Sequence, residues 1–399
     1  MAQVRRTLFA FYYLEDDLQL DPAALLRGEL PSVTGRARVT ALAVLTGERH
    51  HLTPREFDVV TRVPAGRWID DSTLDRDIVS SLMDKGLLIG DAPDGRAAGL
   101  RTRDEALLGT DWNVYAAIYH YMTQWSGVEG AEGEEDVALL RANVKSAAQA
   151  LIERHGPPPP AFAAERAGAP VALPGIERDG QLYDALMARR TTRAFDPDTP
   201  MRLEQLDAVL RYVFGCHGYA RNAAGALCIK RTSPSGGGLH PVEAYPIVSN
   251  VSGVEPGIYH YDARDHALTR LAELDAAASR GAATAFMAGQ SFFGDAHVAF
   301  VLTARYARNH WKYRRHDRAY AGMLMDAAHL SQTLYLVSAD LGLGAFVTIA
   351  INGRDIEERL GLDGVSEGAL AMAGCGPRMA QDSPLDLAFT AGPPPADGA

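Results

Sequence analysis

Cysteine is scarce in this sequence, and long apolar runs are missing. The 399 residues include only three cysteines, Cys216, Cys228 and Cys375, which are widely spaced and form no C-x-x-C pair. An odd, dispersed set of this kind predicts reduced thiols and argues against a cysteine-ligated zinc site. No apolar run reaches about 18 residues, and the N-terminus lacks the apolar core of a signal peptide. We therefore expect a soluble, cytoplasmic protein without a membrane span.

Positive charge is also in deficit. The chain has 39 Lys/Arg against 50 Asp/Glu, a net charge of -11, and a pI near 5.6. Because nucleic-acid binding depends on neutralising phosphates, this balance argues against DNA or RNA as the main partner and leaves a peptide open. Lysine is the rarer cation, and only Lys85, Lys145, Lys230 and Lys312 are present. The other basic residues are all arginine.

Two familiar phosphate-binding motifs are absent. No G-x-G-x-x-G follows a predicted strand and no G-x-x-x-x-G-K-[ST] occurs, so neither a Rossmann site nor a nucleotide-phosphate loop is predicted. Residues 189–195, RRTTRAF, instead place three guanidiniums within five residues, and each is a planar fork suited to phosphate oxygens. Residues 231–241, RTSPSGGGLHP, add glycines that let backbone N–H groups approach a ligand closely. Both stretches suit a phosphorylated cofactor, although arginines at a helix end are also common without one.

The first 95 residues predict a winged-helix-like module. Strands are expected at 7–14, 39–45 and 87–89, and Thr53-Pro54-x-Glu56 is a capping box that starts a helix. A second helix is expected from about residue 72. Residues 1–100 hold 12 Lys/Arg against 15 Asp/Glu, so a DNA-binding face is not evident. Peptide recognition and a purely structural role are the alternatives.

The rest of the chain divides into three regions. Residues 96–180 predict a helical and proline-rich linker region that includes the Gly-Pro-Pro-Pro-Pro run at 156–160. Residues 181–380 interleave helices with strands, which predicts an α+β domain. Its strands are expected at 242–250, 257–261, 296–303, 343–351 and 367–374, and a buried helix at 320–338. Residues 381–399, rich in Pro, Gly and Ala, are expected to be a disordered tail.

The order of the motifs resembles the SagB-type dehydrogenases, a branch of the nitroreductase-like flavoproteins. The pattern R-R-[ST]-x-R-x-F is followed by S-P-S-x-G-x-L-[YH]-P, by Lys312-Tyr313 and by the segment from Arg318 to Gly344, so the match covers about residues 182–380. This resemblance implies a nitroreductase-like FMN-binding domain, a homodimer with the flavin at the subunit interface, and oxidation of peptide thiazolines or oxazolines to thiazoles or oxazoles.

The N-terminal module has a resemblance of its own. Residues 51–89, HLTPREFDVV…LDRDIVSSLMDKGLLI, are similar to the PqqD-like elements that hold leader peptides during ribosomal peptide maturation. In such elements the leader adds a strand to the edge of a sheet. The implied partners are a precursor peptide, held by its leader through residues 1–95, and a cyclodehydratase.

The same resemblance implies which residues bind the cofactor. Arg189, Arg190 and Arg193 would bind the FMN phosphate and ribityl chain, with Thr191 donating a hydroxyl and Arg378 adding a second phosphate contact. The isoalloxazine would be lined by Ser233, Pro234, Ser235, Gly236 and Gly237. Backbone N–H groups near the reactive flavin edge would come from Val347, Thr348, Ile349 and Ala350. Asp326 and His329 are interpreted as core polar residues and His240 as a packing residue, and no metal site is predicted.

Lys312 and Tyr313 match the pair that serves the chemistry in this family. Azoline oxidation removes a hydride and a proton from adjacent carbons, so a base must stand beside the flavin. A lysine amine can act as that base, whereas a guanidinium does not lose its proton in proteins. Two other functions stay open at this point, an NAD(P)H-dependent nitroreductase-like reductase and a non-catalytic scaffold that presents a peptide.

Overall fold

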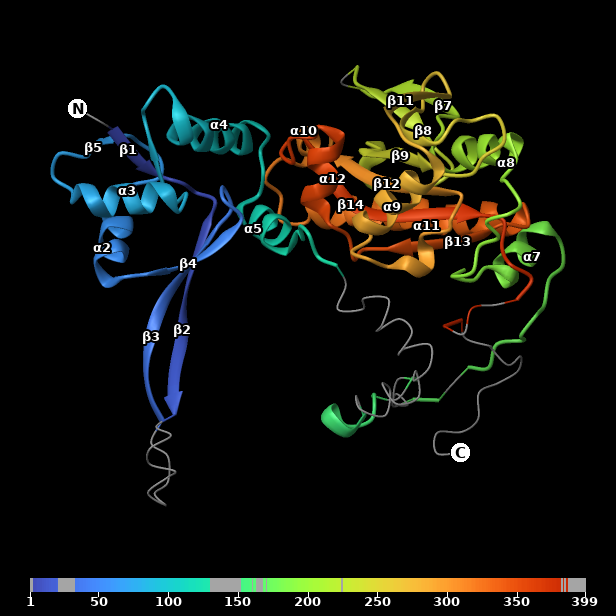
Figure 1. Cartoon of the computed structure of the whole chain (residues 1–399), viewed down its shortest axis with the longest axis horizontal. Coiled ribbons are helices and arrows are strands. Elements are labelled where there is room, and N and C mark those ends of the chain that lie inside the picture. The colour runs from blue at the N-terminus through green and yellow to red at the C-terminus, as the bar shows by residue number, and fades with distance from the viewer. Residues whose placement is uncertain are drawn as a thin grey trace. The chain divides into compact units, whose positions relative to one another are not determined.

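The chain is seen in a computed structural model as two compact units (Figure 1). The structure describes residues 3–20, 33–129, 152–159, 161–162, 168–169, 171–223, 225–381, 383 and 385–386. Unit 1 comprises residues 1–124, 305–323 and 361–368, and unit 2 comprises residues 125–304, 324–360 and 369–399. This division differs from the predicted domains because the segments 305–323 and 361–368 pack with the N-terminal residues. Residues 130–151 of the predicted linker region lie outside the described residues.

Unit 1 holds two small antiparallel sheets. One has the strand order β5-β1-β6, formed by Ile69–Asp70, Gln3–Arg6 and Leu88–Gly90. The other has the order β2-β3-β4, formed by Ala10–Leu20, Val33–Ala43 and Glu48–Leu52. β2 pairs with β3 along its whole length, whereas β4 pairs only with the last part of β3, from Val39. The outer part of β2 and β3 is therefore a two-stranded ribbon (Figure 1).

The predicted capping box is confirmed at the start of α2 (Pro54–Arg62). The Thr53 hydroxyl accepts the Glu56 backbone N–H at 3.2 Å, and the Glu56 carboxylate accepts the Thr53 backbone N–H at 2.8 Å. α3 (Arg76–Asp84) begins after the cap Asp75. Both helices bury apolar side chains against the strands, as expected for amphipathic helices. The resulting core consists of Val4, Ala41, Ala43, Leu52, Val59, Val60, Val63, Val79, Leu82, Leu87 and Leu88.

A second core in unit 1 surrounds Trp112. This residue lies between α4 (Gly95–Gly109) and α5 (Val114–Thr123), and its indole N–H donates to the Val365 carbonyl at 3.0 Å. The Tyr306 ring of α10 (Tyr306–Tyr313) lies 4.6 Å from the Trp112 ring. Burial lowers the pKa of the neighbouring His120 to about 3, so its ring is neutral. This aromatic core takes part of its packing from the C-terminal half of the chain.

Unit 2 is built on a six-stranded sheet with the order β11-β10-β9-β12-β14-β13. The strands are, in that order, Ala267–Glu273, Gly257–Asp262, Val242–Val248, Val298–Arg305, Glu367–Gly376 and Gly344–Thr348. β12 is buried along nearly its whole length, as expected for a central strand covered on both faces. β13 is the edge strand at one end, and this edge carries the candidate site.

The helices of unit 2 include one long element, α11 (Ala319–Asp340), whose first residues belong to unit 1. The others are α7 (Gln181–Ala188), α8 (Leu203–Val209), α9 (Ala276–Phe286) and α12 (Gly353–Leu360), and a hairpin joins β7 (Gly218–Arg221) to β8 (Leu227–Lys230). Mixed helices and strands agree with the predicted α+β class. Among the described residues, none of the helices has the length and apolar character needed to cross a bilayer.

Candidate functional site

The arginine-rich stretch leaves α7 and runs along the edge strand β13. The Arg189 backbone N–H still donates to the Ala185 carbonyl of α7 at 3.1 Å, and the Thr192 N–H donates to the Ala345 carbonyl of β13 at 2.8 Å. The approach is close, because a Cβ added to Gly344 would lie 2.6 Å from the Thr192 side chain. A glycine at position 344 therefore lets the stretch pack against β13.

The same stretch then pairs with the residues that follow β14. The Met379 N–H donates to the Ala194 carbonyl and the Asp196 N–H donates to the Pro377 carbonyl, each at 3.0 Å. These bonds flank an antiparallel bridge between Phe195 and Arg378. Two arginines far apart in the sequence, Arg190 and Arg378, are thereby held on neighbouring segments.

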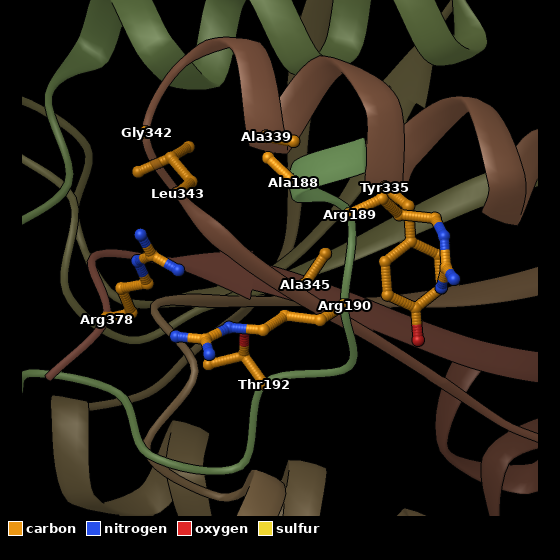
Figure 2. Close-up of a pocket in the computed structure, with 10 residues that line it drawn as sticks. All are labelled: Ala188, Arg189, Arg190, Thr192, Tyr335, Ala339, Gly342, Leu343, Ala345 and Arg378. Atoms are coloured by element: carbon orange, nitrogen blue, oxygen red, sulfur yellow. The ribbon is translucent and has the colours of Figure 1, made fainter. Parts of the chain in front are cut away.

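Arg190 and Arg378 line one small pocket of about 30 Å³. Figure 2 shows both guanidiniums reaching into the same space, which Leu343 and Gly342 border from the end of α11. Arg189 lies apart from them beside Tyr335, with its guanidinium carbon 5.5 Å from the ring centroid. The complete lining is Ala188, Arg189, Arg190, Thr192, Tyr335, Ala339, Gly342, Leu343, Ala345 and Arg378.

Two predicted phosphate ligands do not line this pocket. The Thr191 hydroxyl is hydrogen-bonded to the Tyr335 hydroxyl at 2.9 Å. Arg193 forms an ion pair with Asp386, whose side chain is only 10% exposed, at 2.8 Å. Side chains alternate in direction along extended backbone, so Arg190 and Thr192 face the pocket while Thr191 and Arg193 do not. Asp386 also places the start of the predicted tail within the folded unit; residues 387–399 lie outside the described residues.

The Ser/Gly-rich loop is held by polar side chains of α11. Asp326 accepts the Ser235 hydroxyl at 2.5 Å and the Gly236 backbone N–H at 3.1 Å. His329 Nδ1 lies 3.2 Å from the Pro234 carbonyl, which can only accept, so Nδ1 carries the hydrogen. Thr333 and Ser233 share a hydroxyl contact of 2.6 Å. Asp326 and His329 were expected to be core polar residues, and the structure gives them a more specific position as anchors of this loop.

The loop also has open space where a ligand could approach. A Cβ added to Gly236 or to Gly238 would meet no atom within 4 Å. Gly237 and Gly238 have φ of 63° and 69°, the left-handed region that favours glycine. His240 also has a positive φ, 45°, and its N–H donates to the Ser235 hydroxyl at 2.9 Å.

Residues 347–350 lie at the end of β13. Gln290 fastens them, because its amide donates to the Thr348 hydroxyl at 3.2 Å and to the Ala350 carbonyl at 3.0 Å. The Ile349 side chain is 83% exposed, which is unusual for an isoleucine in an anchored segment. Gln290 was not singled out from the sequence, because nothing in the local pattern links it to a strand 58 residues away.

Lys312 and Tyr313 form the end of α10 in unit 1, whereas the pocket belongs to unit 2. Lys312 Nζ lies 5.5 Å from the centroid of the Tyr313 ring. The next residue, Arg314, has φ of 44°, an uncommon conformation for a residue other than glycine. The catalytic role of the pair stays a prediction.

Cysteine chemistry at this site is disfavoured. All three cysteines are free thiols, as predicted. Cys375 pairs with Ala345 in the ladder between β14 and β13, and burial raises the pKa of its thiol to about 12. A thiol is a poor nucleophile while it keeps its proton. Among the described residues, no group of His, Cys, Asp and Glu side chains is arranged to hold a metal ion.

The pocket fits the anionic end of a cofactor. Two guanidiniums supply planar donors for phosphate oxygens, and the Thr192 side chain lies beside them. The pocket's volume of about 30 Å³ is far below the roughly 300 Å³ or more of pockets that take a whole small molecule, so it suits only a small group. The residues therefore suit the phosphate of a nucleotide such as FMN, and the ring would have to lie outside this pocket.

Comparison with known proteins gives the family. Residues 186–376 match the nitroreductase family model. The chain is 31% identical over 190 residues to the putative nitroreductase MJ1384 of Methanocaldococcus jannaschii, a match that covers 48% of this chain and 88% of that protein. The chain belongs to the nitroreductase family. Its fold is thus nitroreductase-like, and proteins of this family generally bind FMN.

Two further similarities concern peptide processing. The chain is 32% identical over 147 residues to the trifolitoxin-processing protein TfxB of Rhizobium leguminosarum bv. trifolii, which covers 36% of this chain and only 38% of that protein. A chain of the E. coli microcin synthetase McbBCD complex with truncated pro-MccB17 aligns over 68% of this chain and 92% of its own length, at 19% identity and a TM-score of 0.49.

Proposed function

We propose that this nitroreductase-family protein is an FMN-dependent dehydrogenase that oxidises thiazolines or oxazolines in a ribosomally made peptide. The observation that carries the proposal is the convergence of Arg190 and Arg378 on one pocket, because two guanidiniums at the edge of an α+β sheet suit a phosphorylated cofactor. Similarity to a trifolitoxin-processing protein supports a peptide as the substrate. Homodimer formation, with the flavin at the interface, is part of the proposal.

The chain's own residues have distinct parts in this reaction. FMN, when bound, would supply the hydride acceptor for the azoline ring. Lys312 accepts the proton from the adjacent carbon, and Tyr313, whose ring centroid lies 5.5 Å from Lys312 Nζ, positions that side chain. Arg190 and Arg378 bind the phosphate, while the loop at 233–237 and residues 347–350 border the ring. Molecular oxygen would be the electron acceptor that regenerates oxidised FMN.

Residues 1–95 are proposed to recognise the leader peptide. β2 is the terminal strand of its sheet, and its edge away from β3 has no strand partner among the described residues. Phe11 and Leu14 of β2 are 45% and 69% exposed, so an added peptide strand would find apolar contacts. Leu14→Lys should weaken binding of a labelled leader to the full-length protein at least tenfold. Equal binding by Leu14→Lys and the α5 control Tyr115→Ala would refute this assignment.

An anaerobic flavin experiment separates the proposal from its rivals. Purified protein with bound FMN is mixed either with an azoline-containing precursor peptide or with NADPH. The dehydrogenase is supported when the peptide bleaches the flavin absorbance and NADPH does so slowly or not at all. Rapid bleaching by NADPH alone indicates the reductase. A protein that binds the peptide but no FMN indicates the scaffold.

A further inference from the structure

Arg193 is engaged by a turn near the C-terminus. Asp386 Oδ1 accepts from the Arg193 guanidinium at 2.8 Å, and Asp386 Oδ2 accepts the Ser383 backbone N–H at 3.1 Å. The Asp386 N–H donates back to the Ser383 carbonyl at 2.9 Å. Ser383 is 8% exposed, and the Arg193 side chain is 29% exposed. Both carboxylate oxygens thus have partners in a largely buried turn.

The position of Arg193 in the chain gives this ion pair its importance. On one side of Arg193, Thr192 is bonded to β13, and on the other, Ala194 is bonded to Met379. These two contacts set how the segment with Arg190 lies against the segment with Arg378. An ion pair at residue 193 holds the backbone between them.

We propose that Arg193 and Asp386 form a clamp that positions Arg190 and Arg378, and that Arg193 is a positioning residue rather than a phosphate ligand. An arginine already paired with a nearly buried carboxylate offers a phosphate little further attraction. Turning Arg193 toward a phosphate would also leave Asp386 without its cation, which is costly for a buried charge. The inference rests on the proposed function, because the phosphate belongs to FMN.

Charge reversal tests the clamp. Arg193→Asp, Asp386→Arg and the double variant are compared with wild type for FMN affinity, measured by quenching of flavin fluorescence, and for melting temperature. The clamp predicts that each single change weakens FMN binding about tenfold or more and lowers the melting temperature. The double variant should recover most of the FMN affinity, because the ion pair forms again with its charges exchanged. Its melting temperature should recover only in part, because the Ser383 N–H has lost its acceptor.

A direct phosphate contact predicts a different pattern. The double variant would then keep a carboxylate next to the phosphate, so its FMN affinity would stay as low as that of Arg193→Asp, and the clamp would be overturned. If the reversed single variants do not fold, Asp386→Asn replaces them, because it keeps the shape of the turn. The clamp predicts that Asp386→Asn binds FMN more weakly than wild type. Unchanged or tighter FMN binding overturns the clamp. A wild-type protein that binds no FMN refutes the proposed function itself, whereas tight wild-type binding without rescue refutes the clamp alone.

Discussion

Arg190 and Arg378 are the two residues on which the phosphate site depends. Each presents a guanidinium to the same pocket, so the loss of either removes a charged hydrogen-bond donor. A hydrogen bond to a charged group contributes about 1.5–3 kcal/mol, which corresponds to roughly a tenfold to hundredfold change in affinity. Arg190→Ala and Arg378→Ala should each weaken FMN binding by that factor, as measured by fluorescence titration.

Riboflavin supplies the internal control for these two variants, because it lacks the phosphate. Its affinity should hardly change in either of them. The exposed Arg264, in the turn between β10 and β11, gives a matched Arg→Ala variant that should bind FMN like wild type. Equal losses for FMN and riboflavin would show that the two arginines do not act on the phosphate.

Two glycines distinguish a ligand contact from a packing contact. Alanine at position 236 would meet no protein atom within 4 Å, whereas alanine at 344 would clash with Thr192. Gly344→Ala should therefore lower the free energy of unfolding by about 1–3 kcal/mol. Gly236→Ala should leave stability unchanged and weaken flavin binding, because the added methyl group would extend into the space proposed for the flavin. Unaltered flavin affinity in a stable Gly236→Ala protein would mean that this loop does not face the flavin.

At the scale of elements, α11 fixes the Ser/Gly-rich loop through Asp326. Asp326→Ala would leave the Gly236 N–H and the Ser235 hydroxyl without their acceptor, at a cost of about 1–3 kcal/mol. We expect faster hydrogen exchange in residues 233–240 and weaker flavin binding. Asp340→Ala removes an exposed carboxylate from the same helix and should change neither the hydrogen exchange of the loop nor flavin binding. Unchanged exchange of the loop in Asp326→Ala would contradict the anchoring role.

Glu56 of α2 accepts hydrogen bonds from Ser81 and Lys85 at the end of α3, and this contact should make the stability of unit 1 sensitive to acid. Burial alone would raise the pKa of Glu56, but hydrogen bonds from Lys85, Thr53 and Ser81 outweigh it and hold the pKa at about 2, below its ordinary value of 4.5. A carboxylate with a lowered pKa stabilises the fold above the unfolded-state value and loses that effect as pH falls. Stability should therefore decline between about pH 4.5 and pH 2.

The measurement is urea unfolding over that pH range, monitored by a spectroscopic signal that comes from unit 1. Glu56→Gln should be less stable than wild type at neutral pH, and its stability should vary less between pH 4.5 and pH 2. The i,i+4 pair of Arg62 with Asp58 on α2 is a useful comparison, because both side chains are largely exposed. Asp58→Asn should change the acid dependence little. Parallel curves for wild type and Glu56→Gln would exclude Glu56 as the sensitive group.

The same elements show what the sequence could predict. Thr53, Pro54 and Glu56 specify the start of α2 locally, and this prediction is confirmed. The strand at 296–303 and the helix at 320–338 are found as β12 and α11, but α11 is not buried all round, because Leu324 and Met325 are 37% and 58% exposed. The pairing of Arg193 with Asp386 spans 193 positions and leaves no trace in either local pattern. A carboxylate within an apolar helix, such as Asp326, indicates that hydrogen-bond donors lie nearby. The sequence does not identify those donors as the Ser235 hydroxyl and the Gly236 N–H.

At the scale of the whole molecule, unit 1 is assembled from three segments that lie far apart in the sequence, and no local pattern specifies this. Trp112 and Tyr121 bond to the carbonyls of Val365 and Gly364, and these contacts join the N-terminal residues to 361–368. Composition along the chain does not reveal such contacts, because the bonded residues are separated by 253 and 243 positions. The nitroreductase family and the α+β class are confirmed, since they depend on motifs in sequence order, whereas the SagB-type branch stays a prediction.

The central claim, oxidation of an azoline peptide, is tested most directly by mass spectrometry. An azoline-containing precursor peptide is incubated in air with the full-length protein and FMN, alongside a reaction with Lys312→Arg. We predict a loss of about two mass units per ring with wild type, the two hydrogens transferred to the flavin, and a much smaller loss with Lys312→Arg that still binds FMN. An unchanged peptide mass with FMN-loaded wild-type protein would contradict the account.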